Sequence, residues 1–350
     1  MSENKNLLWV NCVRGICVLA VFLIHSESYY DYIIPNVAVF IQPFYVNAFF
    51  FISGFLLFRK QFSSSSFSMP TRDYFKSIGK EYLKNILYRL VIPSVVFSII
   101  EFLPNTILRN KEFSFFAFLG KTLGGCTYWF VSALVVAELL VLLLFVFFRR
   151  KLWVYIIVAS VFAIWGYYLS NNQFYIWSLF PAFPWHYKQG FEALFFLVCG
   201  GVYWEYEEIV DKYLRKKEIT IAMLVCYIIV LSLWPYNIKV LISTNELNII
   251  GVLFSVFATL LLVSLCKVIQ KAPILDYLGR NSLVFYFFSG ALPVCGSIII
   301  HHIFPKESLI GLFCVYVFSI LVSSVISYFI NRFMPWLLDI RKARMNTIVE

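Results

Sequence analysis

The sequence predicts an all-α, polytopic membrane protein with about ten spanning helices and both termini in the cytoplasm. Of its 350 residues, 61% are hydrophobic and only 14% are charged, and the mean hydropathy is +0.80. A soluble domain cannot hide that much apolar surface from water. The apolar residues form long runs, and the basic residues gather in the connections between them. These observations together define the fold class.

Ten apolar runs approach the length of about 20 residues that a spanning helix needs. The predicted helices cover 7–25, 36–58, 86–103, 128–148, 152–170, 190–205, 219–236, 248–267, 281–300 and 309–332. The sixth and seventh are short. We expect the first run to be retained rather than cleaved as a signal peptide, because Arg14 interrupts it and no small-residue cleavage site follows.

The distribution of basic residues predicts the topology. With ten helices the connections alternate between two sides, and Lys and Arg divide 22 to 6 between those sides when Arg14 is set aside as intramembrane. Basic residues stay in the cytoplasm, so both termini are expected there. The longest connection, about 59–85, is too short for a further domain, and we expect residues 1–350 to form one transmembrane domain.

The same pattern excludes several functions. The net charge of +10 follows from membrane topology and does not indicate a nucleic-acid partner. The eight cysteines lie mostly inside apolar runs without a CxxC pair, which is typical of small buried side chains and not of disulfides or zinc ligands. His301 and His302 are adjacent, so on a helix they point in different directions. No metal site is predicted.

The first apolar run, VNCVRGICVLAVFLIH, carries two ionisable residues, Arg14 and His25. Eleven residues of helix place them on one face, about 16 Å apart along the axis. An arginine inside a membrane costs roughly 2.5–3.5 kcal/mol on insertion scales, which favours a wet or anionic cavity beside Arg14. The alternative is a long side chain that reaches the headgroups. For His25 alone, an interfacial histidine and a functional one are equally compatible with the sequence.

Several short motifs follow one another along the chain. The first is the arginine, ten residues and histidine of the first helix. The others are NAFFFISGFLL (47–57), YRLVIP (88–93), TYWFVSAL (127–134), FFLVCGGVY (195–203) and LGRNSLVFYFF (278–288). Each motif alone is weak, whereas the ordered set covers nearly the whole chain and resembles the acyltransferase 3 family of membrane acyltransferases.

The resemblance implies transfer of an acyl group, usually acetyl, from acetyl-CoA or another acyl-CoA to a sugar hydroxyl. The acceptor would be an extracytoplasmic glycan or a lipid-linked saccharide, and the protein would lie among the lipids of the bacterial cytoplasmic membrane. The resemblance gives His25 the catalytic position and makes Arg14 its partner. A neutral imidazole suits the removal of a hydroxyl proton near pH 7, and a transient acyl-histidine stays open as the alternative.

For the donor, the resemblance points to basic residues before the third helix. Arg72, Lys84 and Arg89 belong to a basic run that could bind the phosphates of coenzyme A, and ordinary topology anchoring explains that run equally well. The family usually has two arginines three apart here, and this chain has Ile86 and Arg89. Many relatives also have a histidine where Ser289 stands.

Five further residues are candidates for the acceptor pocket, each with a structural alternative: Ser53, Trp129, Glu138, His186 and Glu192. Ser53 precedes a glycine, and small residues inside membrane helices more often serve close packing. Trp129 and His186 lie where an aromatic belt is expected. Glu138 and Glu192 are acids inside predicted helices, where carboxyl groups are functional by default.

Two other functions compete with acyl transfer. A polysaccharide exporter or flippase on the same helices would use Gly200, Gly201 and Glu192 as a broken helix with an intramembrane acid. A membrane scaffold would leave Arg14 unexplained. The pairing of Arg14 with His25 favours the acyltransferase, because transport needs no aligned base. The acceptor, the acyl chain and the oligomeric state stay open.

Overall fold

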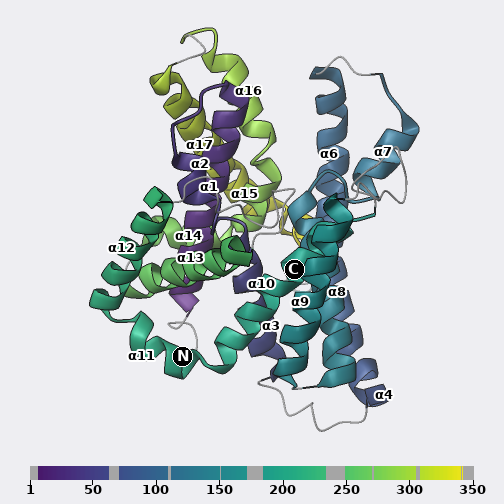
Figure 1. The fold of residues 1–350 in the computed structure, drawn as a ribbon. Coiled ribbons are helices and arrows are strands. Elements are labelled where there is room, and N and C mark those ends of the chain that lie inside the picture. Colours follow the sequence, from purple (N-terminus) through teal and green to yellow (C-terminus); the bar gives the residue numbers. More distant parts are fainter. Residues whose placement is uncertain are drawn as a thin grey trace. The chain divides into compact units, whose positions relative to one another are not determined.

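The structure, a computed structural model, is built of helices throughout the residues that it describes, 7–62, 71–108, 112–149, 151–171, 184–233, 249–269, 272–304, 308–339 and 341. The chain divides into two compact units (Figure 1). Unit 1 comprises Met1–Ile52, Tyr206–Val240 and Asn248–Asn331, and unit 2 comprises Ser53–Glu205, Leu241–Leu247 and Arg332–Glu350. Among the described residues, the unit boundaries fall within α3 (Asn47–Phe62), directly after α10 (Tyr187–Glu205) and within α17 (Leu309–Phe333).

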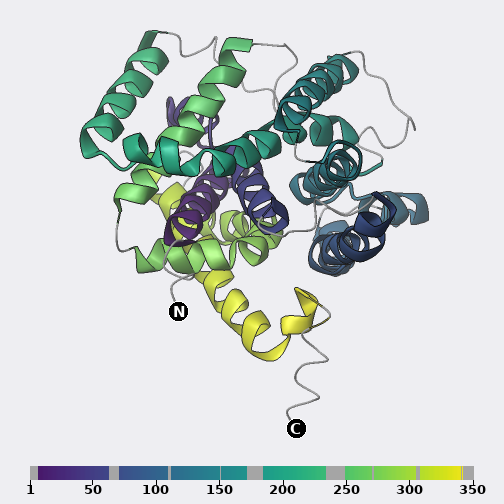
Figure 2. The same cartoon turned by 90° about the horizontal axis from the view of Figure 1, so that it is seen from below.

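Unit 1 is organised around the first helix, α1. Its helices are α1 (Leu8–Tyr30), α2 (Val37–Ile41), the start of α3 (Asn47–Phe62), α11 (Glu207–Leu214), α12 (Lys217–Leu233), α13 (Ile249–Val268), α14 (Pro273–Arg280), α15 (Ser282–Phe288), α16 (Ala291–Ile300) and α17 (Leu309–Phe333). Helices α13, α14, α15 and α16 all pack against α1, and α12 lies beside α13 (Figure 2).

Two glycines allow α14 and α1 to pack at very short range. A Cβ atom on Gly279 would lie 1.9 Å from the carbonyl oxygen of Asn11, and one on Gly15 would lie 2.4 Å from that of Leu275. The Asn11 side chain also donates a 2.8 Å hydrogen bond to Asp276. Small residues that bring backbones together are a frequent basis of helix association in membranes, and here they fix the segment of α1 that carries Arg14.

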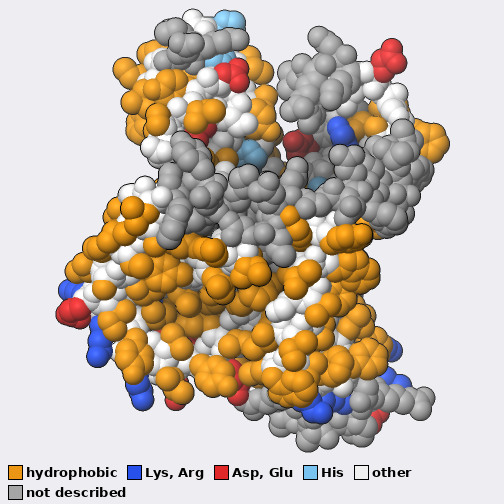
Figure 3. Space-filling model, in the orientation of Figure 1, with side chains coloured by type: hydrophobic (Ala, Val, Ile, Leu, Met, Phe, Trp, Pro, Cys, Tyr) orange, Lys and Arg blue, Asp and Glu red, His pale blue; other side chains and the backbone are white. Residues whose placement is uncertain are grey.

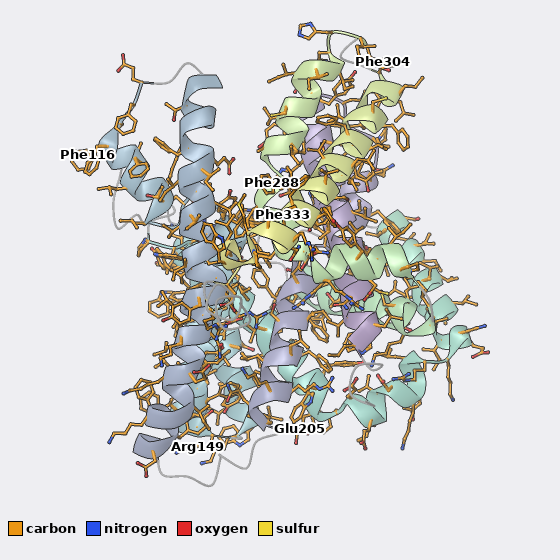
Figure 4. All side chains as sticks on the ribbon, turned by 180° about the vertical axis from the view of Figure 1, so that it is seen from behind. Phe116, Arg149, Glu205, Phe288, Phe304 and Phe333 are labelled. Carbon is orange, nitrogen blue, oxygen red and sulfur yellow. The ribbon has the colours of Figure 1, made fainter. Side chains whose placement is uncertain are left out.

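Unit 2 is a helical bundle in which α10 is central. It contains the rest of α3, α4 (Thr71–Tyr74), the π-helix η3 (Phe75–Gly79), α5 (Lys80–Ile86), the π-helix η4 (Leu87–Val91), α6 (Ile92–Leu108), α7 (Phe115–Thr122), α8 (Trp129–Phe148), α9 (Leu152–Asn171), α10 (Tyr187–Glu205) and the 3₁₀-helix η6 (Pro335–Leu337). Helix α10 packs against both α8 and α9, and Arg149 and Glu205 end α8 and α10 at the end of unit 2 opposite Phe116 of α7 (Figure 4).

Six helices of the described residues have the length and apolar character to cross a membrane, and a bent pair brings the number to seven. They are Leu8–Tyr30, Lys80–Phe102, Trp129–Phe148, Leu152–Leu169, Ile249–Val268 and Leu309–Phe333. Apolar side chains cover much of the surface in Figure 3. The helical class is therefore confirmed, whereas the count of ten and the orientation of the termini stay predictions.

Two predicted helices are broken. The segment predicted as one helix over 36–58 consists of α2 and α3 with a turn at 42–46. Pro43 lies in that turn and lacks a backbone N–H, and its carbonyl accepts a 3.1 Å hydrogen bond from Asn47. The predicted helix 281–300 is bent by 52° between α15 and α16, because the ring of Pro293 excludes a regular helix at the carbonyl four residues earlier.

Two other helices are longer than predicted. Helix α1 continues to Tyr30 instead of ending at residue 25, so His25 lies inside the helix. The third apolar segment begins at Lys80 instead of residue 86, and its helical path passes through η4. Both extensions contain charged and polar residues, which lower the local hydropathy, so the hydropathy pattern did not predict them as helix. The predicted boundaries at 236 and 248 lie outside the described residues.

Candidate functional site

His25 lies within a buried part of α1. The residues after it, Ser26, Glu27 and Tyr30, have exposed fractions of 0%, 4% and 0%, so the helix stays packed beyond the histidine. The imidazole itself is half-buried and stacks on Tyr29, with ring centroids 6.0 Å apart and 12° between the planes. The carbonyl of Tyr29 accepts a 2.8 Å hydrogen bond from Ser297 of α16. A packed helix therefore orients His25.

A polar cluster that the sequence did not indicate surrounds this end of α1. Glu27 accepts a 3.0 Å hydrogen bond from the backbone N–H of Ile34, which ties the loop after α1 back to the helix. Tyr30 stacks on His301, with centroids 4.4 Å apart. Glu27 and Tyr30 sit beyond the predicted end of the helix, which is why the hydropathy pattern gave them no role.

Arg14 lies three turns earlier on the same stripe of α1 and is half-buried. Between Arg14 and His25 this face of the helix is covered by other residues, since Val18 and Phe22 are 2% and 0% exposed. Phe22 packs edge-on against Phe285 of α15, with ring centroids 6.1 Å apart. The two ionisable residues therefore lie at the two ends of a covered apolar segment of one helix, as their spacing predicts.

Arg89 and Glu138 form a second group of ionisable residues, in unit 2. Tyr82 of α5 donates a 3.2 Å hydrogen bond to the backbone carbonyl of Glu138 on α8. The positive charge of Arg89, in η4, acts on the same carboxyl group. Glu138, predicted for the acceptor pocket, thus lies with Arg89, predicted for the donor site.

The other predicted donor residues lie on the same stretch of chain. Lys84 is an exposed residue of α5, and Arg72 belongs to α4. A π-helix at Arg89 departs from the regular α-helical ladder, and such departures are frequent at functional sites. The sequence pattern gives no signal for η4. It gives none for Tyr82 either, because a tyrosine in an apolar helix is typical of a packing residue.

The remaining candidates for the acceptor pocket lie elsewhere in unit 2. Glu192 of α10 is 3% exposed, and its Oε2 atom has no hydrogen-bond partner among the described residues. His186 precedes α10 at a positive φ of 48°. Trp129 begins α8 and is half-buried, with its ring edge-on to Phe130. These residues lie at or near the ends of α8 and α10 opposite Arg149 and Glu205.

Ser53 occupies a position of helix packing. It is half-buried, and the glycine beside it presses α3 against α10, because a Cβ atom on Gly54 would lie 1.8 Å from the carbonyl oxygen of Leu197. This geometry matches the structural alternative that we gave for the pair. In the described part of the chain, no group of three or more His, Cys, Asp or Glu residues could hold a metal ion.

The fold and these residues define a multi-pass membrane protein that keeps ionisable side chains inside its helices. A protein-family model described as an acyltransferase domain matches residues 7–329. The chain therefore belongs to the acyltransferase 3 family, which makes it a membrane acyltransferase. No curated protein and no solved structure gives a significant match.

Proposed function

We propose that the protein transfers an acyl group, preferably acetyl, from cytoplasmic acyl-CoA to a hydroxyl of an extracytoplasmic glycan or lipid-linked saccharide. The membrane would be the bacterial cytoplasmic membrane, and residues 1–350 would act as one transmembrane domain. His25 is the general base in this proposal. Family membership supports acyl transfer, and the geometry of α1 supports the role of His25.

The observation that carries the assignment is the placement of Arg14 and His25 on one unbroken helix. Helix α1 runs from Leu8 to Tyr30, and it remains buried on both sides of His25. An interfacial histidine at a fraying helix end would not need such packing. The rise of about 16 Å between the two residues lets one end meet a donor from one side of the membrane while the other meets an acceptor.

The proposed chemistry follows from the residue at the His25 end of this segment of α1. The Nδ1 or Nε2 atom of neutral His25 takes the proton from a sugar hydroxyl, whose oxygen attacks the carbonyl carbon of the thioester. The carbon–sulfur bond breaks, the new ester forms, and the leaving thiolate of coenzyme A takes the proton from the His25 imidazolium, which restores the neutral base. Stacking on Tyr29 limits rotation of the imidazole. In unit 2, the basic run that includes Lys84 and Arg89 supplies positive charge for donor phosphates.

The deciding experiment is mass spectrometry of cell-envelope glycans from cells with the wild-type chain, His25→Ala or no gene. We expect the mass of one acyl group to be present in the first and missing in the other two. His302→Ala is the matched control, because His302 is exposed, and it should acylate normally. Normal acylation by His25→Ala would exclude the general-base role. Loss of surface glycan instead of its acyl group would favour the exporter.

A further inference from the structure

The C-terminal tail of the chain is bound to α5 and η4 within unit 2. Arg341 donates a 2.6 Å hydrogen bond to the side-chain oxygen of Asn85, lies 3.8 Å from Glu81, and places its guanidinium 5.6 Å from the ring centre of Tyr88. Glu81, Asn85 and Tyr88 occupy successive turns of one helical face. The tail therefore lies on the segment that carries Lys84 and Arg89.

The guanidinium of Arg341 holds a carboxylate of its own tail in a two-pronged contact. Its Nε and Nη2 atoms donate to the Oδ1 and Oδ2 atoms of Asp339 at 2.8 and 2.7 Å, and its backbone N–H donates to Oδ1 at 3.1 Å. Parallel N–H donors of this kind fit a phosphate group as well as they fit a carboxylate. The carboxylate is only 14% exposed.

A second cation from unit 2 acts on the same carboxylate. The charge of Arg89, in η4, also acts on the Asp339 carboxylate, and the contact of Arg341 with the neighbouring Tyr88 places the tail on the stretch of chain that carries Arg89. The result is an anion site with positive charge from two different segments, Arg341 of the tail and Arg89 of η4, with Asp339 as its present occupant.

We propose that Asp339 holds the place of a phosphate group of the acyl donor, and that Arg341 joins Arg89 in binding that phosphate when the donor displaces Asp339. This inference rests on the proposed function, because it requires a donor that carries a nucleotide. The exchange is favourable because a phosphate brings more negative charge and a third acceptor oxygen to the same donors. No covalent bond changes.

The test measures the affinity of purified full-length protein for coenzyme A at low salt, where electrostatic contacts are least screened. Asp339→Asn removes the competing charge and should tighten binding about fivefold, whereas Arg341→Gln should weaken it about tenfold, as expected for hydrogen bonds to a charged group. The double variant should bind as weakly as Arg341→Gln, since Asp339 acts through Arg341. Glu218→Gln, an exposed carboxylate of unit 1, is the matched control and should bind normally.

The outcomes separate this inference from the proposed function. Coenzyme A that binds all four variants and the wild type equally well would overturn the phosphate site and leave acyl-CoA as the donor. Tighter binding of pyrophosphate by Asp339→Asn, lost again in the double variant, would support the site with a second probe. A wild-type protein that binds neither coenzyme A nor pyrophosphate would overturn both the site and the donor.

Discussion

At the scale of single residues, the structure changes the interpretation of His25 more than that of any other predicted residue. The sequence left an interfacial histidine and a base equally open, because the apolar run ends there. The structure continues α1 for five residues, with Ser26 and Tyr30 fully buried. A histidine held in a packed helix and stacked on Tyr29 has the fixed orientation that proton transfer requires.

We predict that His25→Ala lowers the rate of acyl transfer by about 10²- to 10⁴-fold, which is the usual contribution of a positioned base. The half-buried side chain leaves the packing of Ser26 and Tyr30 intact, so the variant should insert and purify as the wild type does. Release of coenzyme A thiol in proteoliposomes measures the rate. A variant with a rate near that of the wild type would leave His25 without a catalytic role.

We predict that Arg14→Lys also impairs transfer although the charge is kept. A guanidinium offers a planar fork of donors, and an ammonium is a point charge. We propose that both residues serve one donor path and one step, so the double variant with His25→Ala should lose no more activity than His25→Ala alone. The same thiol-release assay decides this, and full additivity of the two losses would contradict a shared step.

The effect of Asp339 on donor binding has an expected pH dependence. Hydrogen bonds from Arg341 hold the pKa of this carboxyl below its ordinary value, which is near 3.9. A lowered pKa means that the docked carboxylate contributes at every pH above the ordinary value, and that this contribution is lost as the pH falls through the lowered pKa. The gain in affinity from Asp339→Asn should therefore be the same at pH 5 and pH 7.5. Titration of coenzyme A at both pH values measures it, and a gain confined to pH 7.5 would contradict it.

At the scale of helices, the crossing of α1 and α14 decides where Arg14 is held. Gly279 and Gly15 bring the two backbones together, and Asp276 bonds Asn11 across the contact. In the sequence, Gly279 is distinguished only as part of the LGRNSLVFYFF motif. Its structural reason is the carbonyl of Asn11, a contact between residues far apart in the chain that no local pattern reveals.

We predict that Gly279→Ala destabilises unit 1 by about 1–3 kcal/mol, the usual cost of overpacking, because the added Cβ would meet the carbonyl of Asn11. Gly290→Ala is the matched control, since a Cβ there meets nothing within 4 Å. The temperature at which each purified variant aggregates is the measurement. Equal behaviour of the two variants would show that α14 can move away from α1 without loss.

Sequence reasoning located helices better than it located their breaks and contacts. Each of the ten predicted segments contains helix, because apolar runs determine where helices form. The turn at Pro43 and the bend before Pro293 were missed although both prolines are visible, because a long apolar run outweighs one residue in a hydropathy pattern. The links of Arg89 to Glu138 and to the tail could not be predicted, since a charge pattern does not show which distant partner is met.

At the scale of the whole molecule, the distribution of basic residues still determines the predicted topology. In unit 2, Arg149 ends α8 opposite α7 (Figure 4), as the alternation of basic connections requires. The structure improves the choice of probes. Lys188, predicted to lie in an outer connection, is 6% exposed and would resist labelling on either side, whereas Glu112, in the loop before α7, is exposed.

We predict that single cysteines at Glu112 and Lys151 react from opposite sides of the membrane. Lys151 lies in the exposed connection between α8 and α9, on the side that holds the 22 basic residues, and basic connections stay in the cytoplasm. An impermeant maleimide added to intact cells should label Glu112→Cys above the background of the native cysteines, and Lys151→Cys only after lysis. Lys217→Cys, at the start of α12 in unit 1 and exposed, should behave as Lys151→Cys does. Labelling of Lys151→Cys in intact cells would reverse the orientation. It would place Lys84 and Arg89, which we propose bind the donor, on the side that has no acyl-CoA, so the proposed direction of transfer would fail with it.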